Sequence, residues 1–281
     1  MMGDDSLINA LCVDVDDLAG SSLELGRRVK SPRYCLEFEM QEVLSALERL
    51  AIKATFFFPG YTFQRSPDLV RQVAQAGHDI ASHGMTHDLI RRLGRDRFRS
   101  DAIGSKQALE DIAGSEVDTY KAPCWSITPD SLWAYDILIE AGYRIDHSAM
   151  PPTRRALAQS GDRITPFFYR DALAIIPPTT LSFARLPIRF CGGFYNAYVP
   201  TRIQGRLLAR INKMGLPFNY YFHPYEFRPA PENRRVVKYR SPYLSLYAAH
   251  AGSYERHLAY LGPRFRFATL NVAYKRWLDP A

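Results

Sequence analysis

The sequence predicts an α/β protein whose mostly parallel sheet closes, or nearly closes, into a barrel of about seven strands. The first observation behind this prediction is that short runs of branched and aromatic residues alternate with segments of helical periodicity. The second is that 281 residues, 47% of them hydrophobic, suffice for one barrel domain with an ordinary globular core. The third is that reactive polar residues follow several predicted strands, where barrel proteins place their sites.

The first half of the chain alternates strands and helices with clear boundaries. Buried strands are expected where branched or aromatic residues cluster, at 7–13, 54–58, 78–82, 117–121 and 143–146. Helices are expected where apolar residues recur three or four positions apart, at 42–51, 67–76, 95–112 and 129–141. The second helix has the clearest limits, because Ser66 can cap it, Pro67 suits its first turn and Gly77 ends it.

The second half of the chain is less regular. Beyond residue 151 the pattern loosens and residues 154–169 show no clean period, although strands are expected near 173–176 and 186–190. We interpret the stretch at about 151–200 as an insertion in a single domain that spans residues 1–281. Regular alternation then returns, with a helix at 201–214, a strand at 218–222, a helix at 253–261 and a last strand at 265–269.

Composition and charge exclude several classes of protein. No apolar run approaches the roughly 20 residues that cross a bilayer, and the run at 7–13 leads into aspartates rather than a small-residue cleavage site, so no secretory signal is expected. The four cysteines lie far apart, which indicates reduced, mostly buried thiols and a cytoplasmic location. The formal charge of +7 comes without a nucleic-acid-binding motif, so it indicates solubility or the attraction of an anionic partner such as a phosphate-bearing glycan carrier.

Two histidines and two aspartates provide the first chemical signal. His83 and His87 are four residues apart, so both imidazoles can face one metal ion from a helical turn or a tight loop. Asp14 and Asp16 are expected two residues apart on one strand, where it ends, so that both carboxylates point to the same side of it. One could bind the metal while the other removes a proton, although such aspartates also commonly cap a loop. Two histidines and one carboxylate leave coordination positions open, as catalytic sites do.

A third histidine follows the aromatic strand at 218–222. A histidine at a strand end is commonly a structural hydrogen-bonding residue, but this strand would deliver His223 to the face that holds the metal, where it could protonate a leaving nitrogen. Other polar residues follow predicted strands as well, among them Lys121 and Asp146.

The combined pattern resembles the NodB-homology polysaccharide deacetylases, carbohydrate esterase family four. Five segments carry the resemblance in the family's order, namely VDVDD at 13–17, ATFFF at 54–58, GHDIASHGMTH at 77–87, KAPCW at 121–125 and FHP at 222–224. The segment FRFAT at 265–269 is similar to the family's last strand. The resemblance implies an incomplete, distorted (β/α) barrel that holds a divalent metal ion, usually zinc, with cobalt, manganese and nickel as alternatives.

The resemblance also implies roles for individual residues. Asp16, His83 and His87 would bind the metal. The first motif departs from the family's common T-F-D-D-G and is similar to the D-x-D form of its peptidoglycan deacetylase, amidase and deformylase members, by which Asp14 is the base. A shift of one residue would instead make Asp16 the base and Asp17 the ligand.

The fourth segment carries a second departure. Lys121 stands where the family usually has arginine ahead of the Ala122-Pro123 pair, so the charge is kept but the planar fork that can hold a carboxylate in two bonds is lost. Asp146 and His147 are similar to the D-H-S stretch of amidase-like members, where these residues lie near the mouth of the barrel. Hydrogen bonding at the strand end is an equal alternative for them.

The chemistry implied is hydrolysis of an amide on a sugar nitrogen, with Asp14 as base and His223 as general acid. Trp125 and Tyr225 lie close to the motif segments and could offer a flat face to the sugar ring, although aromatic residues at strand ends more often belong to the core. The substrate would be an N-acylated sugar in a bacterial surface polysaccharide, or a nucleotide-linked or lipid-linked intermediate in the synthesis of lipopolysaccharide or O-antigen. Two alternatives stay open. One is a deformylase or cyclic-amide hydrolase of the same fold, and the other is an inactive, metal-bearing protein that binds glycans.

Overall fold

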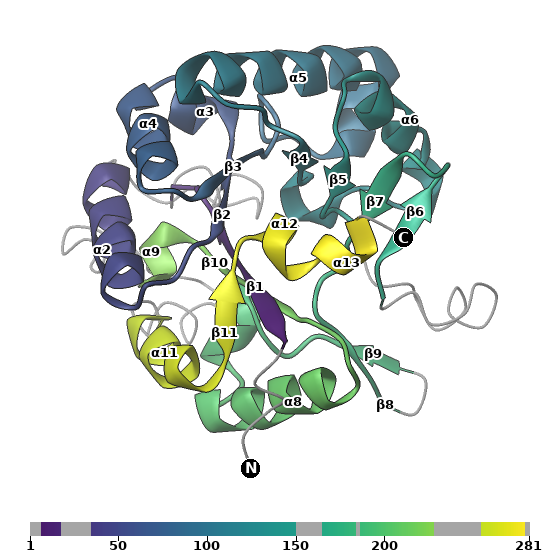
Figure 1. Cartoon of the computed structure of the whole chain (residues 1–281). Coiled ribbons are helices and arrows are strands. Elements are labelled where there is room, and N and C mark those ends of the chain that lie inside the picture. The colour runs from purple at the N-terminus through teal and green to yellow at the C-terminus, as the bar shows by residue number, and fades with distance from the viewer. Residues whose placement is uncertain (1–6, 18–34, 150–164, 184–185, 228–253, 279–281) are drawn as a thin grey trace, which may run out of the picture. The chain divides into compact units, whose positions relative to one another are not determined.

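The computed structural model describes residues 7–17, 35–149, 165–183, 186–227 and 254–278 (Figure 1). The chain divides into two compact units, one formed by Met1–Ala54 with Phe190–Ala273 and the other by Thr55–Arg189 with Tyr274–Ala281. Each unit contains parallel strands connected through helices, so the α/β class and the mostly parallel pairing predicted from the sequence are confirmed. The single domain over 1–281 stays a prediction.

The first unit is built around strand β1 (Ile8–Asp14). Strands β10 (Asn219–Phe222) and β11 (Arg266–Ala268) both pair with β1 in parallel. Its helices are α2 (Leu36–Arg49), α8 (Thr201–Lys213), α9 (Pro224–Phe227), α11 (Tyr254–Leu261) and α12 (Leu270–Ala273), with 3-10 turns at Gly193–Ala197 and Gly262–Arg264. Every residue of β10 is buried, which is typical of parallel strands covered on both faces.

The second unit carries its strands in the order β2 (Thr55–Phe58), β3 (Asp79–Ser82), β4 (Thr119–Tyr120), β5 (Ile145–Asp146), β7 (Leu173–Ile175) and β6 (Phe167–Tyr169). All neighbours in this order pair in parallel except β6 and β7, which are antiparallel. The helices are α3 (Gly60–Phe63), α4 (Pro67–Gln75), α5 (Ile90–Ala113), α6 (Trp133–Glu140) and α13 (Lys275–Leu278), with 3-10 turns at Pro123–Trp125 and Pro129–Ser131. A separate antiparallel pair consists of β8 (Leu181–Phe183) and β9 (Leu186–Ile188).

The predicted elements occur in the predicted order, with differences at their ends. Helix α2 begins at Leu36 rather than at 42, and α5 begins at Ile90 rather than at 95. The early turn of α5 was hidden in the sequence because Gly94, with φ +69°, interrupts the helical backbone. In the stretch interpreted as an insertion, the described strands form the two antiparallel pairs, while 151–164 lie outside the described residues.

The four cysteines differ in how far they are exposed. All four cysteines are free thiols, but only Cys12 and Cys191 are buried, whereas Cys35 is half-buried and Cys124 is exposed. The expectation of mostly buried thiols is therefore correct for half of them. Among the described helices, none combines the length and the apolar character that a bilayer span requires.

Candidate active site

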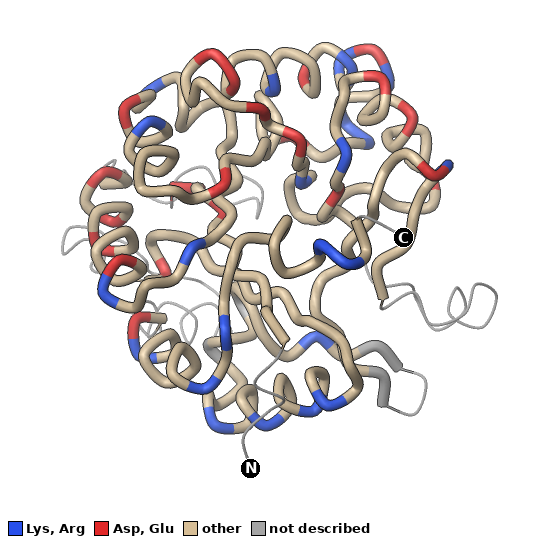
Figure 2. The backbone as a smooth tube through the Cα atoms, in the orientation of Figure 1, with Lys and Arg blue, Asp and Glu red and all other residues tan. Residues whose placement is uncertain are grey.

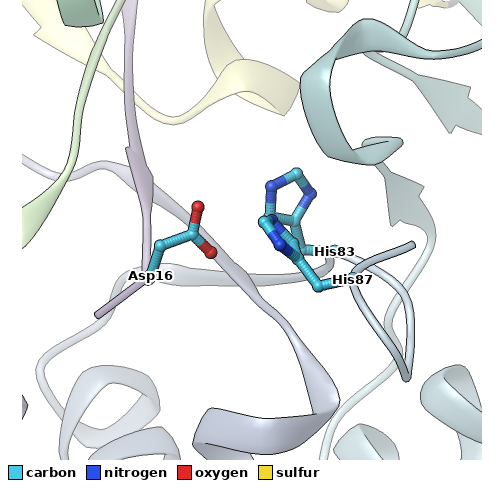
Figure 3. A group of neighbouring side chains, drawn as sticks. All are labelled: Asp16, His83 and His87. Carbon is cyan, nitrogen blue, oxygen red and sulfur yellow. The ribbon is translucent and has the colours of Figure 1, made fainter. Parts of the chain in front are cut away.

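The two histidines of the H-x-x-x-H motif lie on a tight loop that follows β3. Gly84 and His87 both adopt left-handed backbone, with φ of +78° and +58°. This turn brings the two rings together, so that the centroids of His83 and His87 are 4.8 Å apart with nearly perpendicular planes (Figure 3). Both side chains are buried, with 2% and 6% of their surface exposed. The loop therefore presents two imidazoles to the same space, as the spacing predicts.

A backbone contact sets the tautomer of the first histidine. The Nδ1 atom of His83 lies 2.6 Å from the carbonyl oxygen of Lys121. Because a carbonyl oxygen can only accept, Nδ1 must carry the proton and donate it, which leaves the lone pair of Nε2 for another partner. Metal-binding histidines are commonly held in this way by a backbone carbonyl. The donor chemistry of His83 thus fits a metal ligand.

The two aspartates of the first motif lie at the end of β1 in the other unit. The strand ends at Asp14, and the N–H of Asp16 donates to the carbonyl oxygen of Asp14 at 2.8 Å, so a three-residue turn joins them. The expectation that both lie on the strand is therefore wrong for Asp16. Their carboxylates nevertheless approach one atom, since the Nε2 of His223 lies 3.9 Å from Asp14 and 3.7 Å from Asp16.

Asp16, His83 and His87 form a group that could hold a metal ion. One ligand atom of each lies within 4.8 Å of the others, and all three residues are buried (Figure 3). A carboxylate with two imidazoles suits a divalent transition metal with open coordination positions, while the donor set does not choose among such metals. Asp17, the alternative ligand, is half-exposed and outside this group.

His223 is held by a carboxylate three residues further along the chain. Oε2 of Glu226 accepts a hydrogen bond from Nδ1 of His223 at 2.9 Å and another from its backbone N–H at 2.8 Å. Tyr225 stacks on the imidazole, with ring centroids 5.1 Å apart and planes 12° apart. Tyr225 is buried, with 6% of its surface exposed, so its ring supports His223 and is not placed as an open platform for a sugar.

The charges around His223 favour its protonated form. Burial lowers the pKa of the imidazole, but the carboxylates of Glu226, Asp14 and Asp16 together raise it by more than burial lowers it. The resulting pKa is about 9, above the usual value of histidine. With both ring nitrogens protonated, Nδ1 donates to Glu226 and Nε2 points a proton toward the two aspartates. A cation bound at Asp16 would oppose part of this effect. His223 is therefore protonated near neutral pH and can act as a proton donor.

Lys121 is buried beside aromatic rings of the second unit. Its ammonium group lies 5.4 Å from the ring centroid of Phe57 and 4.5 Å from that of Trp125. The guanidinium group of Arg189 lies 5.3 Å from the same indole. Cations over an aromatic face are attracted to it. The half-buried indole of Trp125 thus has two cationic side chains against it.

The turn after β4, which positions the indole of Trp125, contains two non-glycine residues with left-handed backbone. Following Pro123, both Cys124 and Trp125 have positive φ, at +53° and +49°. Left-handed backbone costs about 1–2 kcal/mol per non-glycine residue, so the surrounding contacts must hold it. One of them is the hydroxyl of Ser126, which accepts the N–H of Ile90 at the start of α5.

Asp146 accepts hydrogen bonds that hold the backbone at the end of β5. It is fully buried and accepts hydrogen bonds from the N–H and the hydroxyl of Ser148. The hydroxyl oxygen of Ser148 in turn accepts the N–H of Ala122 at 2.6 Å. Nδ1 of His147 lies 2.7 Å from the carbonyl oxygen of Ile176. These contacts are the hydrogen bonding at the strand end that the sequence left as an alternative, and they tie down the backbone next to Lys121.

Replacement of Asp146 by asparagine is expected to flatten the dependence of stability on pH. Burial raises the pKa of this carboxyl to about 7, although the Ser148 hydrogen bonds lower it. The folded chain therefore keeps the proton above the unfolded pKa near 4, and the free energy of unfolding falls as pH rises from about 4 to 7. Relative to Asp146→Asn, the wild-type chain should lose a few kcal/mol over this range, at about 1.4 kcal/mol per pKa unit. Urea unfolding of both chains between pH 4.5 and 8 checks this, and parallel curves would contradict it.

Three residues of the site were not predicted from the sequence. Glu226 carries a local signal, because it lies three positions after His223 on the turn that becomes α9. Asp101 and Ser105, on α5, contact the histidine loop and its flank. They carry no such signal, since they are 14 and 18 positions from the nearer ligand, His87, in a segment that otherwise reads as a partly solvated helix.

Comparison with known families agrees with this geometry. Residues 35–145 match the family model for polysaccharide deacetylase. Residues 145–275 match the model of a domain of unknown function, DUF3473. The match to the polysaccharide deacetylase model over residues 35–145 confirms the resemblance seen in the motifs. The stretch interpreted as an insertion falls within the second model.

Individual relatives point the same way. The chain is 23% identical over 149 residues to a peptidoglycan deacetylase of Helicobacter pylori, covering 51% of this chain and 50% of that protein. It is 30% identical over 100 residues to a peptidoglycan-N-acetylglucosamine deacetylase of Bacillus cereus, covering 35% and 36%. A chitooligosaccharide deacetylase of a Bradyrhizobium species is 27% identical over 141 residues, covering 49% and 59%. The chain thus spans about half, or less, of the first two relatives.

The fold is shared over nearly the whole chain with a solved structure. A Mycobacterium smegmatis protein assigned to the polysaccharide deacetylases superposes with a TM-score of 0.62 at 20% identity, covering 96% of this chain and 90% of that one. This likeness confirms the fold class predicted from the sequence.

Proposed function

We propose that this chain is a metal-dependent hydrolase that removes an acyl group, such as acetyl, from the nitrogen of an N-acylated sugar. The observation that carries the proposal is the group of Asp16, His83 and His87, whose ligand atoms lie within 4.8 Å of one another. The named relatives, which are deacetylases of peptidoglycan and chitooligosaccharides, support the substrate class. We further propose zinc as the metal, since it accepts this donor set and suits amide hydrolysis.

In the proposed reaction one residue accepts a proton and another donates one. A divalent metal held by the group would supply Lewis acidity toward the acyl oxygen and toward a water molecule. Asp14 would accept a proton as the water oxygen bonds to the acyl carbon. The carbon–nitrogen bond then breaks, and His223 would donate its Nε2 proton to the leaving nitrogen, which leaves poorly unless protonated. Glu226 would hold the imidazole in place throughout, through its 2.9 Å hydrogen bond to Nδ1.

The carbohydrate is proposed to reach the enzyme on an anionic carrier. Helix α8 carries four cationic side chains and no acidic one, and Figure 2 shows this run of blue along the helix; they are Arg202, Arg206, Arg210 and Lys213. All four are exposed. Such a surface attracts phosphate groups, so a nucleotide-linked or lipid-linked intermediate of surface polysaccharide synthesis, such as lipopolysaccharide or O-antigen, fits it. We place this activity in the cytoplasm.

Metal content per chain tests the proposal directly. The purified wild-type protein should hold about one divalent ion, and a folded variant carrying His83→Ala and His87→Ala should hold none. The wild-type protein should then release acetate from N-acetylated chitooligosaccharides. The same metal content in both proteins, or none in the wild type after supplementation with zinc, cobalt, manganese and nickel, would rule out the metal-dependent mechanism.

A substrate panel separates the remaining candidates. Acetylated amino sugars, formylated amino sugars and cyclic imides are offered to the metal-loaded enzyme under identical conditions. Preference for the formylated sugar or the imide would replace deacetylation by the related activity. Binding of chitooligosaccharide without any product from the whole panel would identify a glycan-binding protein instead.

A further inference from the structure

The loop between the two histidine ligands is held by a buried carboxylate on helix α5. Oδ1 of Asp101 accepts the N–H of Met85 at 2.9 Å, and Oδ2 accepts the N–H of Thr86 at 2.9 Å and its hydroxyl at 3.0 Å. Only 7% of the surface of Asp101 is exposed. One side chain thus satisfies two consecutive backbone donors that lie midway between His83 and His87.

The loop is fitted closely around this carboxylate. A Cβ atom placed on Gly84 would lie 2.9 Å from Oδ1 of Asp101 and 3.4 Å from the hydroxyl of Tyr120, and the backbone of Gly84 is left-handed. Only glycine satisfies both the backbone and the space. His87 closes the loop with left-handed backbone of its own, at φ +58°. Because a non-glycine residue favours other conformations, this closure requires contacts that fix it.

A hydroxyl on the same helix holds the other flank of the loop. Ser105 lies one helical turn beyond Asp101, and its Oγ accepts the hydroxyl of Ser82 at 2.9 Å. The Oγ of Ser82 accepts the N–H of Gly84 at 3.2 Å, and Ser105 itself donates to the carbonyl oxygen of Ala102. Ser82, the last residue of β3, directly precedes His83. One face of α5 therefore holds the backbone on both sides of the first ligand.

We propose that Asp101 is a positioning residue that aligns His83 and His87 for a shared metal ion, with Ser105 assisting at the strand end. This inference rests on the proposed metal-dependent function. Contacts behind metal ligands typically change metal affinity or activity by about 10–100-fold when removed. Asp101 touches neither the metal ligands' ring atoms nor the reacting groups, so its effect is expected on affinity and on ligand geometry.

The test compares zinc affinity in two variants of the same helix. Asp101→Asn keeps the shape but turns one acceptor oxygen into a donor that opposes the loop N–H groups, so zinc should bind roughly 10–100-fold more weakly in a chelator competition. Asp111→Asn, an exposed residue of α5, removes the same charge and should leave the affinity unchanged. The visible spectrum of bound cobalt should change in the Asp101 variant only.

Amide hydrogen exchange supplies a readout that needs no metal. In the metal-free wild-type chain the amides of Met85 and Thr86 should exchange slowly, and in Asp101→Asn they should exchange much faster while the amides of β3 stay protected. Thr86→Val removes one of the three hydrogen bonds and tests the same point if Asp101→Asn does not fold; a smaller loss of zinc affinity is expected. Zinc affinity within twofold of wild type in folded Asp101→Asn, or in Thr86→Val when that variant alone folds, would overturn the inference and leave the proposed function standing. A wild-type chain that binds no metal would overturn both.

Discussion

Asp14→Asn is expected to lower the turnover number by about 100- to 10,000-fold, the usual size of a general-base contribution, while the metal stays bound. The reason lies in the turn after β1. Asp14 and Asp16 both approach His223, but Asp16 belongs to the group that could hold the metal, which leaves Asp14 as the carboxylate available to accept a proton. Asparagine keeps the size of the side chain and removes the base. Turnover at saturating substrate and metal content, measured on the same preparation, check the prediction.

A matched pair of variants decides between the two assignments of the first motif. If Asp14 is the base, Asp16→Asn should weaken metal binding and Asp17→Asn should change little, since Asp17 is half-exposed and outside the ligand group. If instead Asp16 is the base and Asp17 the ligand, Asp17→Asn should lose the metal, and Asp16→Asn should keep the metal but lose turnover. Full turnover in Asp14→Asn would remove that residue from the mechanism.

The parts of the fold and site that follow from local sequence were predicted well. Apolar runs bounded by glycine and proline fix where strands and helices lie, because burial and backbone preference act over a few residues. The four-residue spacing of His83 and His87 likewise fixes how far apart the two rings can be. Alternation of strands and helices then predicts parallel pairing, which puts the carboxyl ends of neighbouring strands at one edge. For this reason His83, Lys121 and Asp146 were correctly expected on one edge of β3, β4 and β5.

The parts that depend on long-range contacts could not be predicted from one sequence. Asp101 is buried because α5 packs on β3, and nothing in the helix itself distinguishes it from the exposed residues around it. The tautomer of His83 depends on a backbone oxygen 38 residues away, and every residue has such an oxygen. Tyr225 was considered as a sugar platform because it lies close to the motif segments, whereas its ring packs on His223. Side-chain environment is a property of packing, which periodicity does not describe.

His223→Ala is expected to reduce deacetylation as strongly as loss of the base, again by roughly 100- to 10,000-fold, with metal content unchanged. The half-buried imidazole has the carboxylates of Asp14, Asp16 and Glu226 around it, so it is kept protonated and can donate to a leaving nitrogen. A sugar amine has a high pKa and leaves slowly unless it is protonated. The leaving group of an activated ester or anilide departs more readily, so hydrolysis of such a substrate depends less on proton donation by His223. The loss should therefore be large for the N-acetylated sugar and much smaller for an activated acyl substrate.

Glu226→Gln provides the graded control for this assignment. Glutamine can still accept a hydrogen bond from Nδ1 of His223 but no longer supplies the negative charge at 2.9 Å that raises the imidazole pKa. Turnover of the N-acetylated sugar should fall less than in His223→Ala. As in His223→Ala, turnover of the sugar should fall by a larger factor than turnover of the activated acyl substrate. Equal losses on both substrates in His223→Ala would mean that the histidine orients substrate or metal rather than donating a proton, because only proton donation depends on how well the nitrogen leaves.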